Sequence, residues 1–265
     1  MKESHVDAYL TRIGAARPSH ADAAALRELQ RAHLVTVPFE NLSIHLGEPI
    51  VLDEQALLDK IVDRRRGGFC YELNGAFAAL LRALGYRVTL LSARVFGAGT
   101  VGPPFDHLAL RIDLAESWLV DVGFGAFSHH PLRMGARHDQ HDPGGIFQVI
   151  EAGERAGYGD LDVIMDGEPQ YRLDLRAYEL ADFVPTCWWQ QTSPQSHFTR
   201  SPTCSLLTET GRVTLSGARL IHTVHGEREE RVLSDAGLLD AYRTHFGMTL
   251  ERVPTVADGG RPSSE

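Results

Sequence analysis

One cysteine stands where a thiol could act as a nucleophile. The stretch RGGFCYELNGAF, residues 66–77, places Cys70 shortly after two glycines and at the start of an apolar pattern with helical spacing. A free thiol is weakly nucleophilic at neutral pH, and a helix N-terminus stabilises the thiolate through its aligned backbone dipoles. The position therefore favours a nucleophilic thiol, although a buried core cysteine is an equally good interpretation of this stretch alone.

A nucleophilic thiol needs a base and a group that orients the base, and residues 105–125 offer both. His107 opens one predicted strand, and Asp121 lies in the apolar run of the next, where an unpaired carboxylate would be costly. A three-residue loop between the strands would pair Asp113 with Ser117 and set Asp121 diagonal to His107 on one face. A four-residue loop would separate them. Taken singly, a strand-edge histidine and a hydrogen-bonded core acid are the better interpretations.

The elements that would position these residues fall into regions of different periodicity. Up to about Gly85 the apolar spacing is helical and predicts four helices: one ending at Gly14, one opening at Ser19, one opening at Asp53 and one beginning at or just before Cys70. From Arg87 the period is two, which predicts short consecutive strands and an antiparallel barrel or sandwich. These strands are expected at residues 87–96, 107–114, 118–123, 146–151, 161–165 and 171–175.

The rest of the chain alternates between the two patterns. A helical or irregular link is expected at residues 178–191, followed by strands at 205–209, 213–215 and 219–225. A last helix is expected after Ser234, and the final stretch DGGRPSSE, residues 258–265, has the composition of a disordered tail.

Composition narrows the function further. The 265 residues are 43% apolar and carry a formal charge of -9, with one short basic run at Arg64 to Arg66. This argues against nucleic acid as a partner, because phosphate binding needs a clustered basic surface. No stretch resembles a signal peptide or a membrane span, so we expect a cytoplasmic protein without a membrane partner. Three unevenly spaced cysteines favour reduced thiols over a disulfide framework or a zinc site.

Several motifs together resemble one family. RGGFCYELNGAF, VPFENLSIHLG at 37–47, DHLAL at 106–110 and VDVGFG at 120–125 resemble segments of the arylamine N-acetyltransferases, as does TSPQSHF at 192–198. The resemblance covers most of the chain, from about Tyr9 to Ile221. It implies an α+β fold in three parts: a helical bundle over 1–85, an antiparallel β-barrel over 86–190 and a C-terminal α/β lid over 191–265.

The resemblance also implies a chemistry. Cys70 would accept the acetyl group, His107 would be its base, and Asp121 would orient His107. Acetyl-CoA would acetylate the thiol, and after CoA leaves, an arylamine, arylhydrazine or arylhydroxylamine would take the acetyl group in a ping-pong mechanism. The expected partners are therefore CoA and a small aromatic amine or hydrazine, with no metal required, and a homo-oligomer is compatible with the sequence.

Further residues follow from the same resemblance. It points to an apolar slot for the aryl ring, lined by Phe39, Val95, Phe124 and Phe198. Arg66 would be structural, with Glu40 and Asn41 as its partners. There is no Walker loop, so CoA is expected in a surface cleft between barrel and lid. The contacts predicted there are Gly125, Thr203 and Ser205, with residues 99–104 and 201–205 as polar edges.

Three alternatives stay open at this point. A thiol peptidase or transglutaminase uses the same three residue types, although the PFENL and VDVGFG context favours acetyl transfer. An amide synthase of the same fold would close a polyketide chain onto an aromatic amine. A non-enzymatic metal-binding protein is suggested by His129, His130, His138 and His141, but their spacing fits no common zinc pattern.

Overall fold

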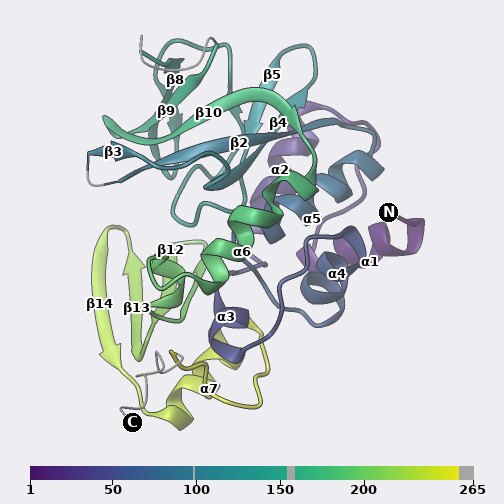
Figure 1. The fold of residues 1–265 in the computed structure, drawn as a ribbon. Helices are drawn as coiled ribbons and strands as arrows, with labels where there is room; N and C mark the ends of the chain where they lie inside the picture. Colours follow the sequence, from purple (N-terminus) through teal and green to yellow (C-terminus); the bar gives the residue numbers. More distant parts are fainter. Residues whose placement is uncertain (98, 154–158, 257–265) are drawn as a thin grey trace.

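The computed structural model describes residues 1–97, 99–153 and 159–256, and it arranges them as a helical part, a large antiparallel sheet and a smaller C-terminal sheet (Figure 1). The predicted α+β fold class is confirmed. The predicted tail, 258–265, lies outside the described residues. Among the residues described, the helices lack the combination of length and apolarity that crossing a membrane requires.

The N-terminal helices surround a long buried helix that starts at the cysteine. They are α1 (Glu3–Ile13), α2 (Ala23–Leu34), α3 (Leu42–Leu46), α4 (Glu54–Leu58), the single π-turn η1 (Asp59–Asp63) and α5 (Cys70–Ala83). The predicted start of α5 and the predicted end of α1 at Gly14 are confirmed. The predicted start of the second helix at Ser19 is wrong, because Asp22 caps that helix by accepting a hydrogen bond from the Ala25 amide.

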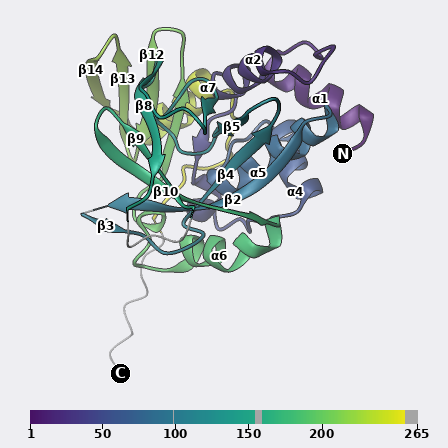
Figure 2. The same ribbon diagram turned by 90° about the horizontal axis from the view of Figure 1, so that it is seen from above.

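The large sheet curls into a barrel beside α5 (Figure 2). Its strands run in the order β6-β5-β4-β2-β10-β9-β8-β7, with β3 paired to β2. Their bounds are β2 (Arg87–Gly97), β3 (Thr100–Val101), β4 (His107–Asp113), β5 (Ser117–Val120), β6 (Leu132–Arg133), β7 (Gln140–Asp142), β8 (Gly145–Glu151), β9 (Leu161–Met165) and β10 (Glu168–Tyr178). The predicted pairing of Asp113 with Ser117 is confirmed. β5 ends at Val120, short of the predicted Gly123, because the chain leaves the sheet where Asp121 enters a buried polar network.

The C-terminal sheet contains a strand from the N-terminal region. Its order is β1-β11-β12-β13-β14, with bounds β1 (Phe39–Glu40), β11 (Thr203–Leu207), β12 (Gly211–Ser216), β13 (Arg219–Val224) and β14 (Glu227–Val232), and α7 (Asp235–Phe246) follows. Phe39 pairs with Ser205 and Glu40 with Cys204, and Leu42 lies in the same apolar core as Leu215. Residues 37–47 therefore connect the cysteine-bearing part to the C-terminal sheet.

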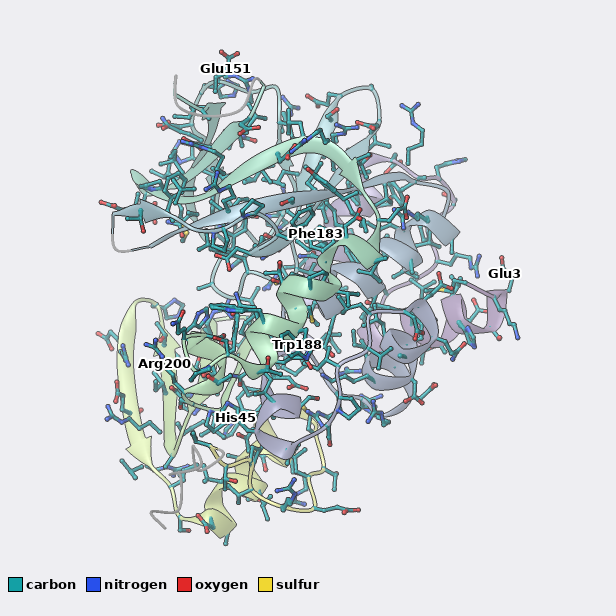
Figure 3. All side chains as sticks on the ribbon, viewed as in Figure 1. Glu3, His45, Glu151, Phe183, Trp188 and Arg200 are labelled. Atoms are coloured by element: carbon teal, nitrogen blue, oxygen red, sulfur yellow. The ribbon has the colours of Figure 1, made fainter. Side chains whose placement is uncertain are left out.

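A helical link runs between the two sheets. It consists of η2 (Leu180–Phe183), α6 (Val184–Thr192) and η3 (His197–Thr199), and α6 crosses the centre of the view in Figure 1. Figure 3 shows two of its side chains, Phe183, which is buried in the helical core, and Trp188, which is 64% exposed. The link brings residues 189–198 close to the cysteine.

Candidate active site

The glycines before Cys70 make room for neighbouring protein groups. A Cβ on Gly67 would lie 1.9 Å from the Pro38 carbonyl oxygen, and one on Gly68 would lie 2.7 Å from the Glu72 side chain. Because they have no side chains, these glycines allow residues 38–40 to pair beside the helix start and allow Glu72 to fold back over it.

Glu72 caps the helix that carries the thiol. Its Oε2 accepts a hydrogen bond from the Phe69 amide at 3.2 Å, and its Oε1 is 2.6 Å from the Lys60 ammonium. Burial raises the pKa of Glu72, and Lys60 opposes that rise. A helix N-terminus favours negative charge, so this arrangement keeps the first turn of α5 ordered directly at Cys70.

A second ion pair continues the network. Arg66 contacts Glu40 at 2.9 Å and Glu48 at 3.1 Å. Burial would raise the pKa of Glu40, but Lys60 and Arg66 overcome that effect and lower the pKa. Glu40 is therefore a partner of Arg66, as the sequence suggested. Asn41, the other suggested partner, bonds elsewhere: its amide donates to the carbonyls of residues 198 and 201 and accepts from the amide of residue 203.

His107 and Asp121 meet on one face of the barrel. His107 Nε2 is 2.7 Å from Asp121 Oδ2, and both side chains are buried. This bond leaves Nδ1 of the same ring free of Asp121, and Cys70 lies near enough to the ring to raise the pKa of His107. The diagonal placement predicted from the three-residue loop thus brings imidazole and carboxylate together.

Asp121 is a buried carboxylate with four hydrogen-bond donors. Besides His107, the Tyr171 hydroxyl donates to Oδ2 at 3.1 Å, while the Asn74 amide and the Gly123 backbone N–H each donate to Oδ1 at 2.9 Å. A buried carboxylate is tolerated when its oxygens are satisfied in this way. Asn74 comes from α5, one helical turn after Cys70, so the helix that carries the thiol also holds the acid.

The electrostatic balance favours a charged imidazole. Burial lowers the pKa of His107, but the charge and hydrogen bond of Asp121, together with Cys70, outweigh burial and raise that pKa to about 10. His107 is therefore protonated at neutral pH. A cation next to a thiol favours the nucleophilic thiolate.

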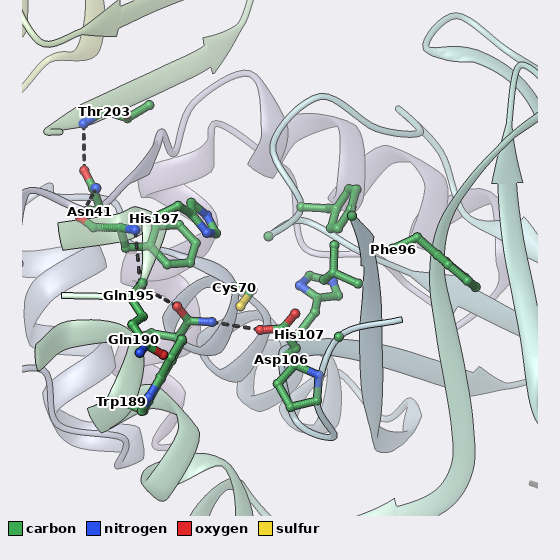
Figure 4. Close-up of a pocket in the computed structure, with 18 of the residues that line it drawn as sticks. Asn41, Cys70, Phe96, Asp106, His107, Trp189, Gln190, Gln195, His197 and Thr203 are labelled. Carbon is green, nitrogen blue, oxygen red and sulfur yellow. Dashed lines mark hydrogen bonds between the residues drawn. The ribbon is translucent and has the colours of Figure 1, made fainter. Parts of the chain in front are cut away.

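Cys70 and His107 open onto a cavity of about 620 Å³ (Figure 4). All four residues predicted for the aryl slot line it, and so does Thr203, one of the predicted CoA contacts. Those four are Phe39, Val95, Phe124 and Phe198. The ring of Phe124 lies edge-on to His107, with 5.0 Å between centroids.

The other two predicted CoA contacts do not line that cavity. Gly125 and Ser205 instead share one partner, because Arg212 donates to the Gly125 carbonyl at 3.0 Å and to the Ser205 hydroxyl at 3.2 Å. Arg212 thereby connects β12 of the C-terminal sheet to the loop that follows Asp121.

Sequence reasoning missed several residues of the site. Asn74 was visible as a polar residue on an apolar helix, but its partner was not. Tyr171 carried no local signal, since it reaches Asp121 from β10. Asp106 precedes His107 directly and lines the cavity with Gln190, a residue of the link whose amide donates to it at 2.8 Å.

Hydrogen bonds to Asp142 hold the first two residues of the histidine-rich segment, His129 and His130. Asp142 accepts hydrogen bonds from the backbone N–H groups of His129 and His130 and also bonds the His130 ring. In the described ranges, no group of three or more metal-ligating side chains converges.

A cysteine at a helix N-terminus, next to an imidazole held by a carboxylate at the wall of an aromatic cavity, is the arrangement of thiol-dependent acyl-transfer enzymes. The comparisons with known proteins agree with this class. An N-acetyltransferase family model matches residues 22–255. The arylamine N-acetyltransferase of Escherichia coli K12 is 33% identical over 249 residues, which span 92% of this chain and 88% of the relative.

Solved structures show the same similarity. The arylamine N-acetyltransferase of Salmonella typhimurium superposes with a TM-score of 0.87 at 31% identity, covering 96% of this chain and 94% of the other. The Mycobacterium marinum arylamine N-acetyltransferase in complex with CoA gives a TM-score of 0.82 at 30% identity, covering 92% of each chain. This chain belongs to the arylamine N-acetyltransferase family.

Proposed function

We propose that this protein transfers an acetyl group from acetyl-CoA to an arylamine, arylhydrazine or arylhydroxylamine through an acetyl-Cys70 intermediate. The observation that carries the proposal is the position of Cys70, at the N-terminus of α5 and at the wall of an aromatic cavity, beside a His107 ring held by Asp121. The family relationship and the CoA complex of the M. marinum relative support acetyl-CoA as the donor.

In the first half-reaction the Cys70 thiolate attacks the thioester carbonyl. The bond between the acetyl carbon and the CoA sulfur breaks, and the leaving thiolate takes the proton of the His107 imidazolium. Donor and intermediate are both thioesters, so the exchange is close to balanced, and the covalent intermediate divides one difficult encounter into two easier ones.

In the second half-reaction the acceptor nitrogen, or the oxygen of an arylhydroxylamine, attacks the acetyl-Cys70 carbonyl. His107, now neutral, takes the proton of the attacking atom, and the bond between the acetyl carbon and Sγ breaks to restore the thiolate. Asp121 stabilises the imidazolium that forms. Phe39, Phe124 and Phe198 would bind the ring and exclude water, which would otherwise hydrolyse the intermediate.

The remaining predicted residues have supporting roles in this proposal. Arg66 and Glu40 hold the start of α5, and Asn41 fixes the segment that carries Phe198 and Thr203. Thr203, which lines the cavity, would contact CoA there. Gly125 and Ser205 meet CoA at the junction of the two sheets, where Arg212 joins them.

Intact-mass spectrometry tests the proposal. Brief exposure to acetyl-CoA without an acceptor should add one acetyl group to the wild-type protein, and addition of an arylamine should remove it. Cys70→Ala should gain no acetyl group, whereas Cys204→Ala, which alters a buried cysteine in β11, should behave as the wild type. An acetyl group retained in Cys70→Ala, or none on folded, reduced wild-type protein, would contradict the proposal.

A further inference from the structure

One wall of the cavity is polar, in contrast to the aromatic slot. Asp106 lies beside His107 at this wall, and Gln190, Gln195, Ser196 and His197 from the link contribute the rest. Figure 4 shows the Asp106 carboxylate between Gln190 and His107. The proposed acetyl transfer assigns no role to this carboxylate.

Buried hydrogen bonds fix the orientation of Asp106. Gln190 Nε2 donates to Asp106 Oδ1 at 2.8 Å, and Ser196 Oγ donates to Gln190 Oε1 at 2.6 Å. Gln190 and Ser196 are 2% and 1% exposed. Because the Gln190 oxygen is already an acceptor for Ser196, the amide must present its nitrogen to Asp106. The carboxylate is thus held by uncharged donors.

The groups whose positive charge acts on Asp106 are the two neighbouring histidines, His107 and His197. In the part of the chain that the structure describes, neither a lysine nor an arginine forms an ion pair with it. Burial lowers the pKa of His197, the nearest histidine of the link, and so favours its neutral form, with Arg200 adding to that effect. Burial also raises the pKa of Asp106, against which His107 and His197 act. His107, in turn, is paired with Asp121.

An ionised carboxylate can only accept hydrogen bonds, and its two oxygens together have about four acceptor positions. Gln190 fills one of them, which leaves acceptor capacity at the cavity wall. A ligand group that donates a hydrogen bond would be stabilised there, whereas a ligand carboxylate would meet a like charge in a poorly solvated site.

We propose that Asp106 is a specificity-determining residue that favours acetyl acceptors bearing an uncharged hydrogen-bond donor, such as an amide or hydroxyl group, and rejects acceptors bearing a carboxylate. This inference rests on the proposed acetyl transfer and narrows its substrate class. It concerns the second half-reaction, since the acceptor enters the cavity after CoA has left.

A matched pair of acceptors tests the inference. The acceptors are 4-aminobenzamide and 4-aminobenzoate, which have nearly the same shape and differ in charge, and the assay is the ratio of their kcat/KM values at pH 8. The wild-type protein should prefer the amide by about 30-fold, the size expected for two like charges roughly 8 Å apart at an effective dielectric constant near 20. Asp106→Asn should reduce the ratio to about threefold or less.

The ratio separates selectivity from general damage. A variant that only disturbed His107 or the fold would lower both kcat/KM values together and leave their ratio unchanged. Asp106→Ser, which keeps an oxygen acceptor without the charge, gives the same measurement if Asp106→Asn does not fold. Asp63→Asn removes one exposed carboxylate at the end of η1 and should keep the wild-type ratio.

The outcomes are distinct. A collapse of the ratio in Asp106→Asn, but not in Asp63→Asn, supports the inference. Wild-type protein that acetylates both acceptors equally well, or a ratio that stays unchanged in Asp106→Asn, overturns the role of Asp106 while acetyl transfer itself stands. Wild-type protein that acetylates neither amine, although acetyl-CoA acetylates its Cys70, overturns this inference alone, whereas wild-type protein whose Cys70 gains no acetyl group overturns the proposed function.

Discussion

Replacing Asp121 with asparagine should convert the charged pair at the nucleophile into a neutral one. In the wild-type protein, burial alone would lower the pKa of His107, and Asp121 with Cys70 reverses this effect to give a value of about 10. An asparagine at this position carries no charge, but the ring stays buried. The pKa of His107 in Asp121→Asn should therefore fall below its ordinary value of about 6.5.

The size of the effect follows from the state of the sulfur. With His107 protonated, its positive charge favours the thiolate of Cys70 over the thiol. Without the imidazolium, a thiol with the ordinary pKa of about 8.5 is roughly 3% ionised at pH 7. The rate of alkylation at Cys70 should then fall about 30-fold at pH 7, which corresponds to about 2 kcal/mol.

Iodoacetamide alkylation as a function of pH measures this directly, with peptide mass spectrometry to separate Cys70 from the buried Cys187 and Cys204. Because a raised pKa keeps His107 charged below about pH 10, the wild-type rate should depend less on pH between about pH 6 and 9 than the rate of the variant does. In Asp121→Asn the rate should rise about tenfold per pH unit up to about pH 8.5.

Tyr171→Phe is the matched control. It removes the hydroxyl that donates to Asp121 Oδ2 but leaves the carboxylate and its other three donors in place. Its alkylation profile should keep the wild-type shape. A flat profile in Asp121→Asn, with native unfolding behaviour, would refute the view that Asp121 sets the charge of His107.

For three further substitutions the structure predicts the direction of the effect. Gly123→Ala would place a Cβ 2.6 Å from Cys70 Cα, so acetylation of Cys70 should slow by about 100-fold in a mass-spectrometric time course. Lys60→Met would leave the buried Glu72 carboxylate without its cation, and urea unfolding should show a loss of about 3–5 kcal/mol. Asn41→Ala would release residues 198–203, so the KM for an arylamine should rise about tenfold while acetylation of Cys70 changes little.

Each of these three substitutions has a control variant. Gly135→Ala adds a Cβ with no atom within 4 Å and should keep wild-type acetylation. Arg64→Met removes an exposed partner of Asp59 and should change the unfolding free energy by less than about 1 kcal/mol. Asn41→Asp keeps an acceptor for the Thr203 amide but loses both donors, so only partial recovery of KM is expected. If a substitution and its control variant had equal effects, the contact assigned to the substituted residue would be contradicted.

The parts of the site that are encoded locally could be predicted from the sequence. The start of α5 at Cys70 follows from an apolar helical pattern, and the juxtaposition of His107 and Asp121 follows from the length of one hairpin loop. Both depend on residues fewer than twenty positions apart. In such cases periodicity and turn length determine which side chains share a face.

Contacts between distant segments could not be predicted in this way. Asn41 bonds residues 198–203, some 160 positions away, and Tyr171 reaches Asp121 from a strand that the sequence placed in the barrel without a register. Lys60 contacts Glu72 from the π-turn η1. The spacing of apolar residues in the sequence does not reveal that the helix widens into a π-turn there. These pairings depend on how whole elements pack, and a single sequence carries no local record of that packing.

The two-residue strand β1 shows why such a distant contact matters for the proposed chemistry. Successive side chains of a strand point to opposite faces. The Glu40 side chain contacts Arg66 at the start of α5, while Phe39 lines the cavity at Cys70. The backbone of β1 meanwhile pairs with β11 of the C-terminal sheet. A shift of one residue in this pairing would send the carboxylate into the aromatic slot and leave Arg66 with Glu48 alone, so the register of β1 couples the charge network under Cys70 to the shape of the acceptor site.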